Sequence, residues 1–127
     1  MQVRVKERMS AATQVVKPDD PIRAAALAMH RQQVEIVPVG TVGDLLGVVS
    51  ARDLVVRCIA AGIDPDTAPV RLAMTLGVPT CSPDDDLDGA LGGMLKMHSN
   101  SLIVCDLNHT VVGVISISQA IADWAVR

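Results

Sequence analysis

Apolar and polar positions follow one another in this chain in a pattern that occurs twice. Residues 46–54 begin with an apolar run and continue into a polar turn, with Ser50 and Asp53 three positions apart. The same pattern returns at residues 112–120, with Gln119 in the position of the aspartate. A short apolar run that leads into a helical pattern is typical of a buried strand followed directly by a helix. The chain is therefore predicted to contain two copies of one unit.

The repeat extends beyond this stretch. A shift of 65 residues brings Met9 onto Met74, and after one inserted residue near Asn108 a shift of 66 brings Gly47 onto Gly113. Self-similarity at a fixed period is the sequence signature of a repeated structural unit.

Each copy is predicted to contain a helical lead-in and then a strand, a helix, two strands and a helix. The lead-ins and strands are predicted at residues 5–9, 15–17, 36–39 and 45–49, and again at 70–74, 80–82, 101–104 and 111–115. The last helix of the first copy is expected at residues 51–61, with Leu54, Val55, Cys58 and Ile59 as its apolar positions and Gly62 at its end. Its counterpart carries Ala120, Ile121, Trp124 and Ala125 at the matching apolar positions.

The first helix of each copy has an apolar face. Asp20 is predicted to cap this helix in the first copy, with Pro21 at the first helical position, where proline's missing N–H group costs nothing. The apolar positions follow the i, i+3, i+4, i+7 spacing of an amphipathic helix. They are Ile22, Ala25, Ala26 and Met29 in the first copy and Leu87, Ala90, Leu91 and Met94 in the second.

Composition narrows the class of protein. The chain is 50% hydrophobic, yet Trp124 is its one aromatic residue, so the core must be packed from aliphatic side chains. The net charge of −3 gives no basic field to attract DNA or an anionic membrane. No apolar run approaches the roughly 20 residues of a membrane span. The amino-terminal residues lack the apolar core of a signal peptide, so a cytoplasmic location is expected. Three cysteines without CxxC spacing fit a reducing compartment.

The junction after the apolar run has side chains that suit a nucleotide. A helix N-terminus presents unpaired N–H groups to a phosphate, and Ser50 adds a hydroxyl there. Asp53 offers two acceptor oxygens to the two donors of a ribose diol, and Arg52 could offset phosphate charge. The same Ser-x-x-Asp spacing is also a capping box, which would explain both copies without any ligand.

The repeat, the order of elements and the Gly-x-x-Ser-x-x-Asp junction resemble a CBS-domain pair, often called a Bateman module, over nearly the whole chain. Residues 53–57 and 60–67 further resemble stand-alone actinobacterial CBS proteins of the mycobacterial hypoxia-response type. The resemblance implies an α/β (α+β) fold in which two pseudo-two-fold related β-α-β-β-α units pack through their sheets. The units would be residues 1–62 and 70–127, joined by a linker at 63–69.

The resemblance also implies a function. Such modules often bind AMP, ADP, ATP or S-adenosylmethionine in clefts between the units and regulate another activity, and catalysis by the module itself is not expected. They commonly form homodimers, and we expect contacts from the helix faces of Met29 and Met94. The alternative is a ligand-free protein–protein interaction or dimerisation module. No cofactor is required under either interpretation.

Mapping the family pattern onto this sequence gives two sets of candidate residues. The ligand-binding set is Ser10, Gln14, Val34, Glu35, Ile36, Ser50, Arg52 and Asp53. The second, weaker cleft would contain Thr75, Thr80, Ser101, Ser116 and Gln119. Because Gln119 is neutral and carries one carbonyl acceptor, occupancy should favour the Asp53 cleft by roughly tenfold or more.

Other chemistry-bearing residues point to no separate site. The spacing of His98, Cys105 and His109 suits no common zinc pattern, and no nucleophilic triad, P-loop or dinucleotide glycine motif is present. Cys81 and Cys105 fall in strands of the second copy. They could be neighbours in the sheet, or simply two small buried hydrophobic residues.

Overall fold

The computed structural model describes residues 3–11 and 14–121. The first unit contains α1 (Ile22–Gln32), β2 (Ile36–Thr41), β3 (Asp44–Ser50), α2 (Ala51–Asp53) and the π-helix η2 (Leu54–Ile59). The second contains β5 (Thr80–Cys81), α3 (Leu87–Lys96), β6 (Ser101–Cys105), β7 (Val111–Ser116) and α4 (Ile117–Ala120). The lead-ins are η1 (Val5–Glu7) with β1 (Ser10–Ala11), and η3 (Val70–Leu72) with β4 (Thr75–Leu76).

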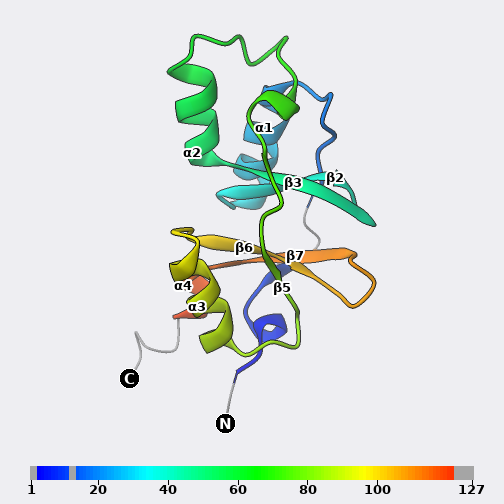
Figure 1. Cartoon of the computed structure of the whole chain (residues 1–127), viewed down its shortest axis with the longest axis vertical. Helices are drawn as coiled ribbons and strands as arrows, with labels where there is room; N and C mark the ends of the chain where they lie inside the picture. Colours follow the sequence, from blue (N-terminus) through cyan, green and yellow to red (C-terminus); the bar gives the residue numbers. More distant parts are fainter. Residues whose placement is uncertain (1–2, 12–13, 122–127) are drawn as a thin grey trace.

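Two β-sheets face each other across the middle of the molecule, and the helices cover their outer sides (Figure 1). One sheet has the strand order β2-β3-β4, and the other has the order β1-β7-β6-β5. The predicted α+β fold of two similar units packed through their sheets is therefore confirmed. Between the sheets lies a small apolar cluster, which includes Ile36, Val48, Ile103 and Val114.

The central hairpins are alike in detail. β2 pairs antiparallel with β3, and the register shifts between Val39 and Gly40. β6 pairs antiparallel with β7, and the register shifts between Val104 and Cys105, which are 65 positions further along. A bulge conserved between two halves of one chain is a built feature of the unit rather than a local defect.

The two lead-ins are exchanged between the units. β1 pairs with β7 of the second unit, and β4 pairs with β3 of the first. The N–H group of Val5 donates to the Asp85 carbonyl at 2.8 Å, and the N–H group of Val70 donates to the Asp20 carbonyl at the same distance.

Ion pairs repeat the same exchange. Lys6 Nζ lies 3.1 Å from Asp84 Oδ1, and Arg71 pairs with Asp19, which are the equivalent residues of the other half.

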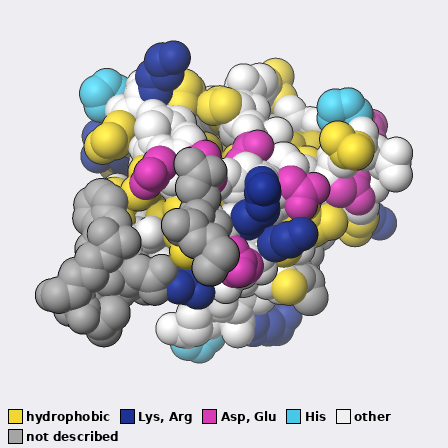
Figure 2. Space-filling view, turned by 90° about the horizontal axis from the view of Figure 1, so that it is seen from below, with side chains coloured by type: hydrophobic (Ala, Val, Ile, Leu, Met, Phe, Trp, Pro, Cys, Tyr) yellow, Lys and Arg dark blue, Asp and Glu magenta, His cyan; other side chains and the backbone are white. Residues whose placement is uncertain are grey.

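Figure 2 shows a face on which basic and acidic side chains are interleaved and hydrophobic side chains lie between them. That face therefore carries no extended field of one sign.

Gly47 and Gly113 make the exchanged pairing possible. A Cβ atom at Gly47 would overlap the carbonyl oxygen of Thr75, and one at Gly113 would overlap the carbonyl oxygen of Ser10. The repeated glycine thus lies where the lead-in strand crosses the hairpin, and any side chain there would force the strands apart.

The first helix of the first unit differs from the prediction in its start and in its buried face. It begins at Ile22 with Pro21 as the N-cap, and the Asp20 carboxylate instead accepts from the Lys17 N–H at 2.9 Å. Proline at ψ 147° is extended, so Asp20 lies one residue too early to cap the helix. Ala28 is buried in place of Ala26, which is exposed.

The second unit follows its prediction more closely. Asp86 stands 65 residues after Pro21 and caps α3 by accepting from the Gly89 N–H at 2.7 Å. All four predicted apolar positions, Leu87, Ala90, Leu91 and Met94, are buried. The predicted copy of the last helix includes Trp124 and Ala125, which lie outside the described residues.

Strand predictions failed only for the shortest elements. Residues 15–17 form no strand, and Val16 makes an isolated bridge to Val39. β1 and β4, two residues each, were not predicted. A two-residue strand has too few positions to show alternation, so its partner decides its existence.

The last helix of the first unit stands at the edge of its sheet, while α1 covers the outer face (Figure 1). Of the predicted apolar positions, Cys58 is buried and Leu54 packs against the core, whereas Val55 and Ile59 are 56% and 72% exposed. With Val56, which is 50% exposed, they form the η2 apolar face. Within the part of the chain that is described, no helix has the length and apolar character to cross a membrane.

Candidate functional site

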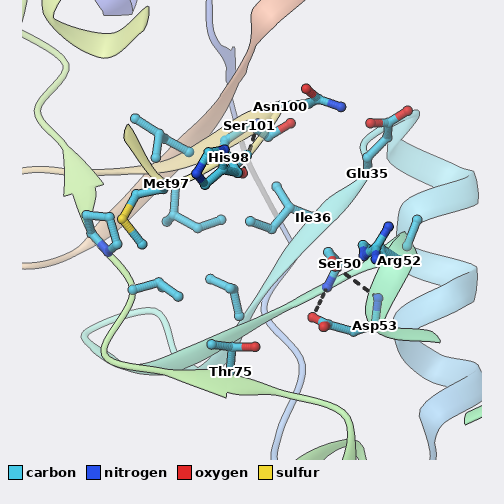
Figure 3. A pocket seen from close by; sticks show the side chains of 17 residues that line it. Glu35, Ile36, Ser50, Arg52, Asp53, Thr75, Met97, His98, Asn100 and Ser101 are labelled. Carbon is cyan, nitrogen blue, oxygen red and sulfur yellow. Dashed lines mark hydrogen bonds between the residues drawn. The ribbon is translucent and has the colours of Figure 1, made fainter. Parts of the chain in front are cut away.

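A cavity of about 320 Å³ opens between the two sheets, beside the junction of β3 and α2 (Figure 3). Its volume lies at the lower end of the roughly 300–1,000 Å³ range of small-molecule pockets. Aliphatic side chains from both sheets form much of its wall, namely Ile36, Val48, Val78, Leu102 and Ile103. Polar and charged groups enter from two opposite segments, one in each unit.

The first polar segment is the junction Ser50–Asp53, which is a closed capping box. Ser50 Oγ accepts from the Asp53 N–H at 3.0 Å, and Asp53 Oδ2 accepts from the Ser50 N–H at 2.9 Å. The Ala51 N–H donates to the Glu35 carbonyl at 2.9 Å, so the start of the helix is also tied to β2. These bonds hold both side chains in fixed positions at the cavity wall.

Asp53 keeps a second oxygen outside the capping box. Asp53 Oδ1 lies 3.7 Å from Arg57 Nε, and the Asp53 side chain is 16% exposed. Arg57 also donates from Nη1 to the Met74 carbonyl at 3.0 Å, just before Thr75 in the cavity wall. Arg57 therefore connects the carboxylate to the exchanged lead-in.

The second polar segment follows α3 and contains Met97, His98, Asn100 and Ser101. His98 has a positive φ of 51°, which turns the chain sharply out of the helix. Asn100 and Ser101 lie 65 residues after Glu35 and Ile36. The equivalent residues of both repeats thus meet in one cavity, as a pseudo-two-fold arrangement requires.

The sequence grouped the candidate residues into two clefts, and the structure groups them differently. Glu35, Ile36, Ser50, Arg52 and Asp53 line the cavity together, as expected. Ser10, Gln14 and Val34 are not among its lining residues, whereas Thr75 and Ser101, which had been grouped with Gln119, are. The exchange of lead-ins is the physical reason for two of these differences, because it brings Thr75 to the first unit and Ser10 to the second.

The lining residues that were not candidates from the sequence include Met97, His98, Asn100, Val78 and Pro79. The repeat contained a signal for Asn100, since a shift of 65 places it on Glu35. Nothing in the sequence pattern separates the other four from ordinary turn and core positions.

The second junction is closed by bonds within the protein. Gln119 Oε1 accepts from the Ser116 N–H at 2.9 Å, and Gln119 Nε2 donates to Ser10 Oγ at 2.8 Å. The Gln119 N–H donates to Ser116 Oγ at 3.3 Å. The amide of Gln119 therefore uses both its oxygen and its nitrogen to join α4 to the exchanged β1 strand.

Cys81 and Cys105 lie on neighbouring strands but on opposite faces of the sheet. Cys81 is paired in register with Val104 and packs in the core under α3, whereas Cys105 packs between the sheets. Burial, with smaller contributions from Asp85 and Cys105, raises the pKa of Cys81 from 9.0 to about 12. Burial also raises the pKa of Cys105. Both are free thiols with the character of buried hydrophobic residues.

The other residues considered from the sequence form no second site among the described residues. Thr80 lies in β5, where it pairs with Ile103, and it is not among the residues that line the cavity. Among the described residues, no three histidine, cysteine, aspartate or glutamate side chains gather where they could hold a metal ion.

A tandem β-α-β-β-α unit with exchanged lead-ins and a cavity between its sheets defines a paired-repeat module. The chain belongs to the CBS domain family, whose sequence profile matches residues 5–59 and 70–122. It is a CBS pair of the regulatory kind.

Known relatives agree with this assignment. The CBS domain-containing protein YhcV of Bacillus subtilis is 30% identical over 115 residues, which cover 91% of this chain and 81% of the relative. Hypoxic Response Protein I, solved with two coordinated zinc ions, is 24% identical with a TM-score of 0.80, over 95% of this chain and 98% of that one. The CBS domain pair of MJ0100, solved with 5′-methylthioadenosine and S-adenosyl-L-methionine, is 21% identical with a TM-score of 0.82, over 98% and 97%. At these identities the two solved structures establish similarity of fold.

Proposed function

We propose that this CBS pair is a regulatory module that binds an adenosine-type ligand in the cavity beside Asp53. The observation that carries the proposal is the cavity itself, about 320 Å³ between the sheets, with the Ser50–Asp53 junction fixed at its wall. Asp53 Oδ1 is the acceptor available to a ribose diol, and the aliphatic walls suit the faces of a purine ring. The solved pair of MJ0100 with two adenosine compounds supports the same ligand class.

A binding screen tests this proposal directly. AMP, ADP, ATP, S-adenosylmethionine and NADH would each be titrated while the melting temperature is measured. A ligand present at 100 times its dissociation constant should stabilise the protein by about 2.7 kcal/mol. Unchanged melting curves for the whole panel would contradict the proposal.

The variant Asp53→Asn tests the role of the carboxylate. Asparagine keeps an oxygen for the Ser50 N–H group, so the fold should be retained. A neutral acceptor contributes about 1 kcal/mol and a charged one about 1.5–3 kcal/mol, so affinity should fall roughly tenfold. Calorimetric titration would measure this, with Asp44→Asn at the far end of β3 as a control for lost charge. Undiminished binding to Asp53→Asn, together with lost binding to Gln119→Ala, would place the ligand in the other cleft.

We propose as a second candidate that the module acts through association, with or without a ligand. The η2 apolar face favours this function, because Val55, Val56 and Ile59 are all at least half exposed on one short helix. The predicted contact through Met29 and Met94 is wrong, since both side chains are buried in the cores of their own units. A homodimer would therefore use the η2 apolar face instead.

A further inference from the structure

The charges that face the cavity are not those of a phosphate site. The charged side chains in its wall are Glu35, Arg52 and Asp53, and His98 adds an imidazole from the opposite unit. Because Arg57 already pairs with the Asp53 carboxylate, Glu35 and Arg52 are the charges left over in the wall, and together they sum to zero. Figure 3 shows Glu35 and Arg52 on the same side of the cavity, so this side carries one charge of each sign.

Three of the backbone N–H groups at the junction are also already in use. The N–H groups of Ser50 and Asp53 are bonded within the capping box, and the Ala51 N–H is bonded to the Glu35 carbonyl. A phosphate gains most of its binding energy at such a position from unpaired N–H groups. To reach these three groups here, a phosphate would have to displace hydrogen bonds that the protein makes with itself, and each displaced bond costs free energy.

We propose that Glu35 determines the specificity of the cavity by excluding phosphate, so that the ligand is an adenine nucleoside with a neutral or cationic 5′ group. This inference rests on the proposed function and names the ligand class of the same site. A phosphate monoester carries a charge of about −1.5 to −2 near neutral pH, so it meets repulsion from Glu35, while Arg57 already offsets the Asp53 charge. A sulfonium group meets attraction instead. The small cavity volume, about 320 Å³, agrees with a nucleoside rather than a nucleoside triphosphate.

Adenosine and AMP form the matched pair that tests this, because they differ only in the phosphate. Calorimetric titrations would compare both with S-adenosylmethionine on the full chain, on Glu35→Gln and on Asp44→Asn. Glu35 is exposed, so glutamine should leave the fold intact, and the melting temperature checks this. Asp44 lies at the start of β3 and is not among the cavity-lining residues, so Asp44→Asn removes the same charge away from the cavity.

We expect adenosine to bind the unaltered protein at least about tenfold more tightly than AMP. Glu35→Gln should narrow that ratio by raising the affinity for AMP alone, and it should lower the affinity for S-adenosylmethionine. Asp44→Asn should change none of the three affinities. AMP binding as tightly as adenosine, or a ratio that Glu35→Gln leaves unchanged, would overturn the role of Glu35 while the adenosine site stands. Failure of all three ligands to bind would overturn the proposed function, and this inference with it.

Discussion

At the scale of single residues, Gly47 and Gly113 carry no side chain because another strand occupies the space. A Cβ atom at Gly47 would overlap the backbone of Thr75, which cannot move without opening the β3–β4 pairing. Gly47→Ala should therefore destabilise the protein by roughly 1–3 kcal/mol, the usual cost of overpacking. Urea denaturation would measure this change.

Gly92→Ala is the matched control. Gly92 lies within α3, and a Cβ atom there would meet nothing within 4 Å. Alanine should stabilise the helix by about 0.5–1 kcal/mol. Equal effects of the two substitutions would mean that the Gly47 position tolerates a side chain and that the close crossing is not required.

The residues at the junction were predictable for a local reason. Ser50 and Asp53 are three positions apart at a strand-to-helix boundary, and that spacing suffices for a capping box in any context. His98 was not predictable, because its place in the cavity depends on how α3 ends and on which unit lies opposite. Local sequence patterns therefore determine positions such as Ser50 and Asp53, whereas tertiary packing determines positions such as His98.

At the scale of elements, each lead-in stabilises the opposite unit. The η1–β1 lead-in stabilises the second unit, and the η3–β4 lead-in stabilises the first. Val5 is fully buried in the core of the second unit, and Val70, its equivalent, is fully buried in the core of the first. Val5→Ala should destabilise the protein by about 2–3 kcal/mol through the cavity that it leaves. Hydrogen exchange should then quicken first in β6 and β7.

Val70→Ala should have the converse effect, with faster exchange in β2 and β3. The two variants remove the same atoms from equivalent positions, so each serves as the control for the other. Faster exchange in β2 and β3 on substitution of Val5 would contradict the exchange of lead-ins.

The hairpins and long helices could be predicted, and the lead-in strands could not. β2, β3, β6 and β7 have continuous apolar runs with turn residues between them, and α1 and α3 have clear helical spacing. The two residues of β1 acquire their strand conformation from β7. Assigning each lead-in to its neighbour in sequence therefore misplaced Ser10 and Thr75 by one cleft.

At the scale of the whole molecule, the η2 apolar face is the surface from which a homodimer would be built. Ile59 is 72% exposed, so Ile59→Asp should leave the fold intact and abolish association at micromolar concentration. Light scattering coupled to gel filtration would measure the mass. Leu107→Asp is the control, since Leu107 is 92% exposed in the β6–β7 turn and should not affect a dimer formed through η2. A monomeric unaltered protein would contradict the dimer.

Because each half contributes a strand to the sheet of the other unit, the chain could be divided into two fragments that complete one another. A cut after Gly77, an exposed residue with φ of 65°, leaves residues 1–77 with all of β2, β3 and β4 and with the η1–β1 arm. Residues 78–127 then lack the strand that pairs with β7, and the arm of the other fragment supplies it. The two fragments, produced together, should therefore copurify by complementation. Removing residues 3–11 from the longer fragment should abolish that recovery, because the arm carries both the strand and the Val5 side chain.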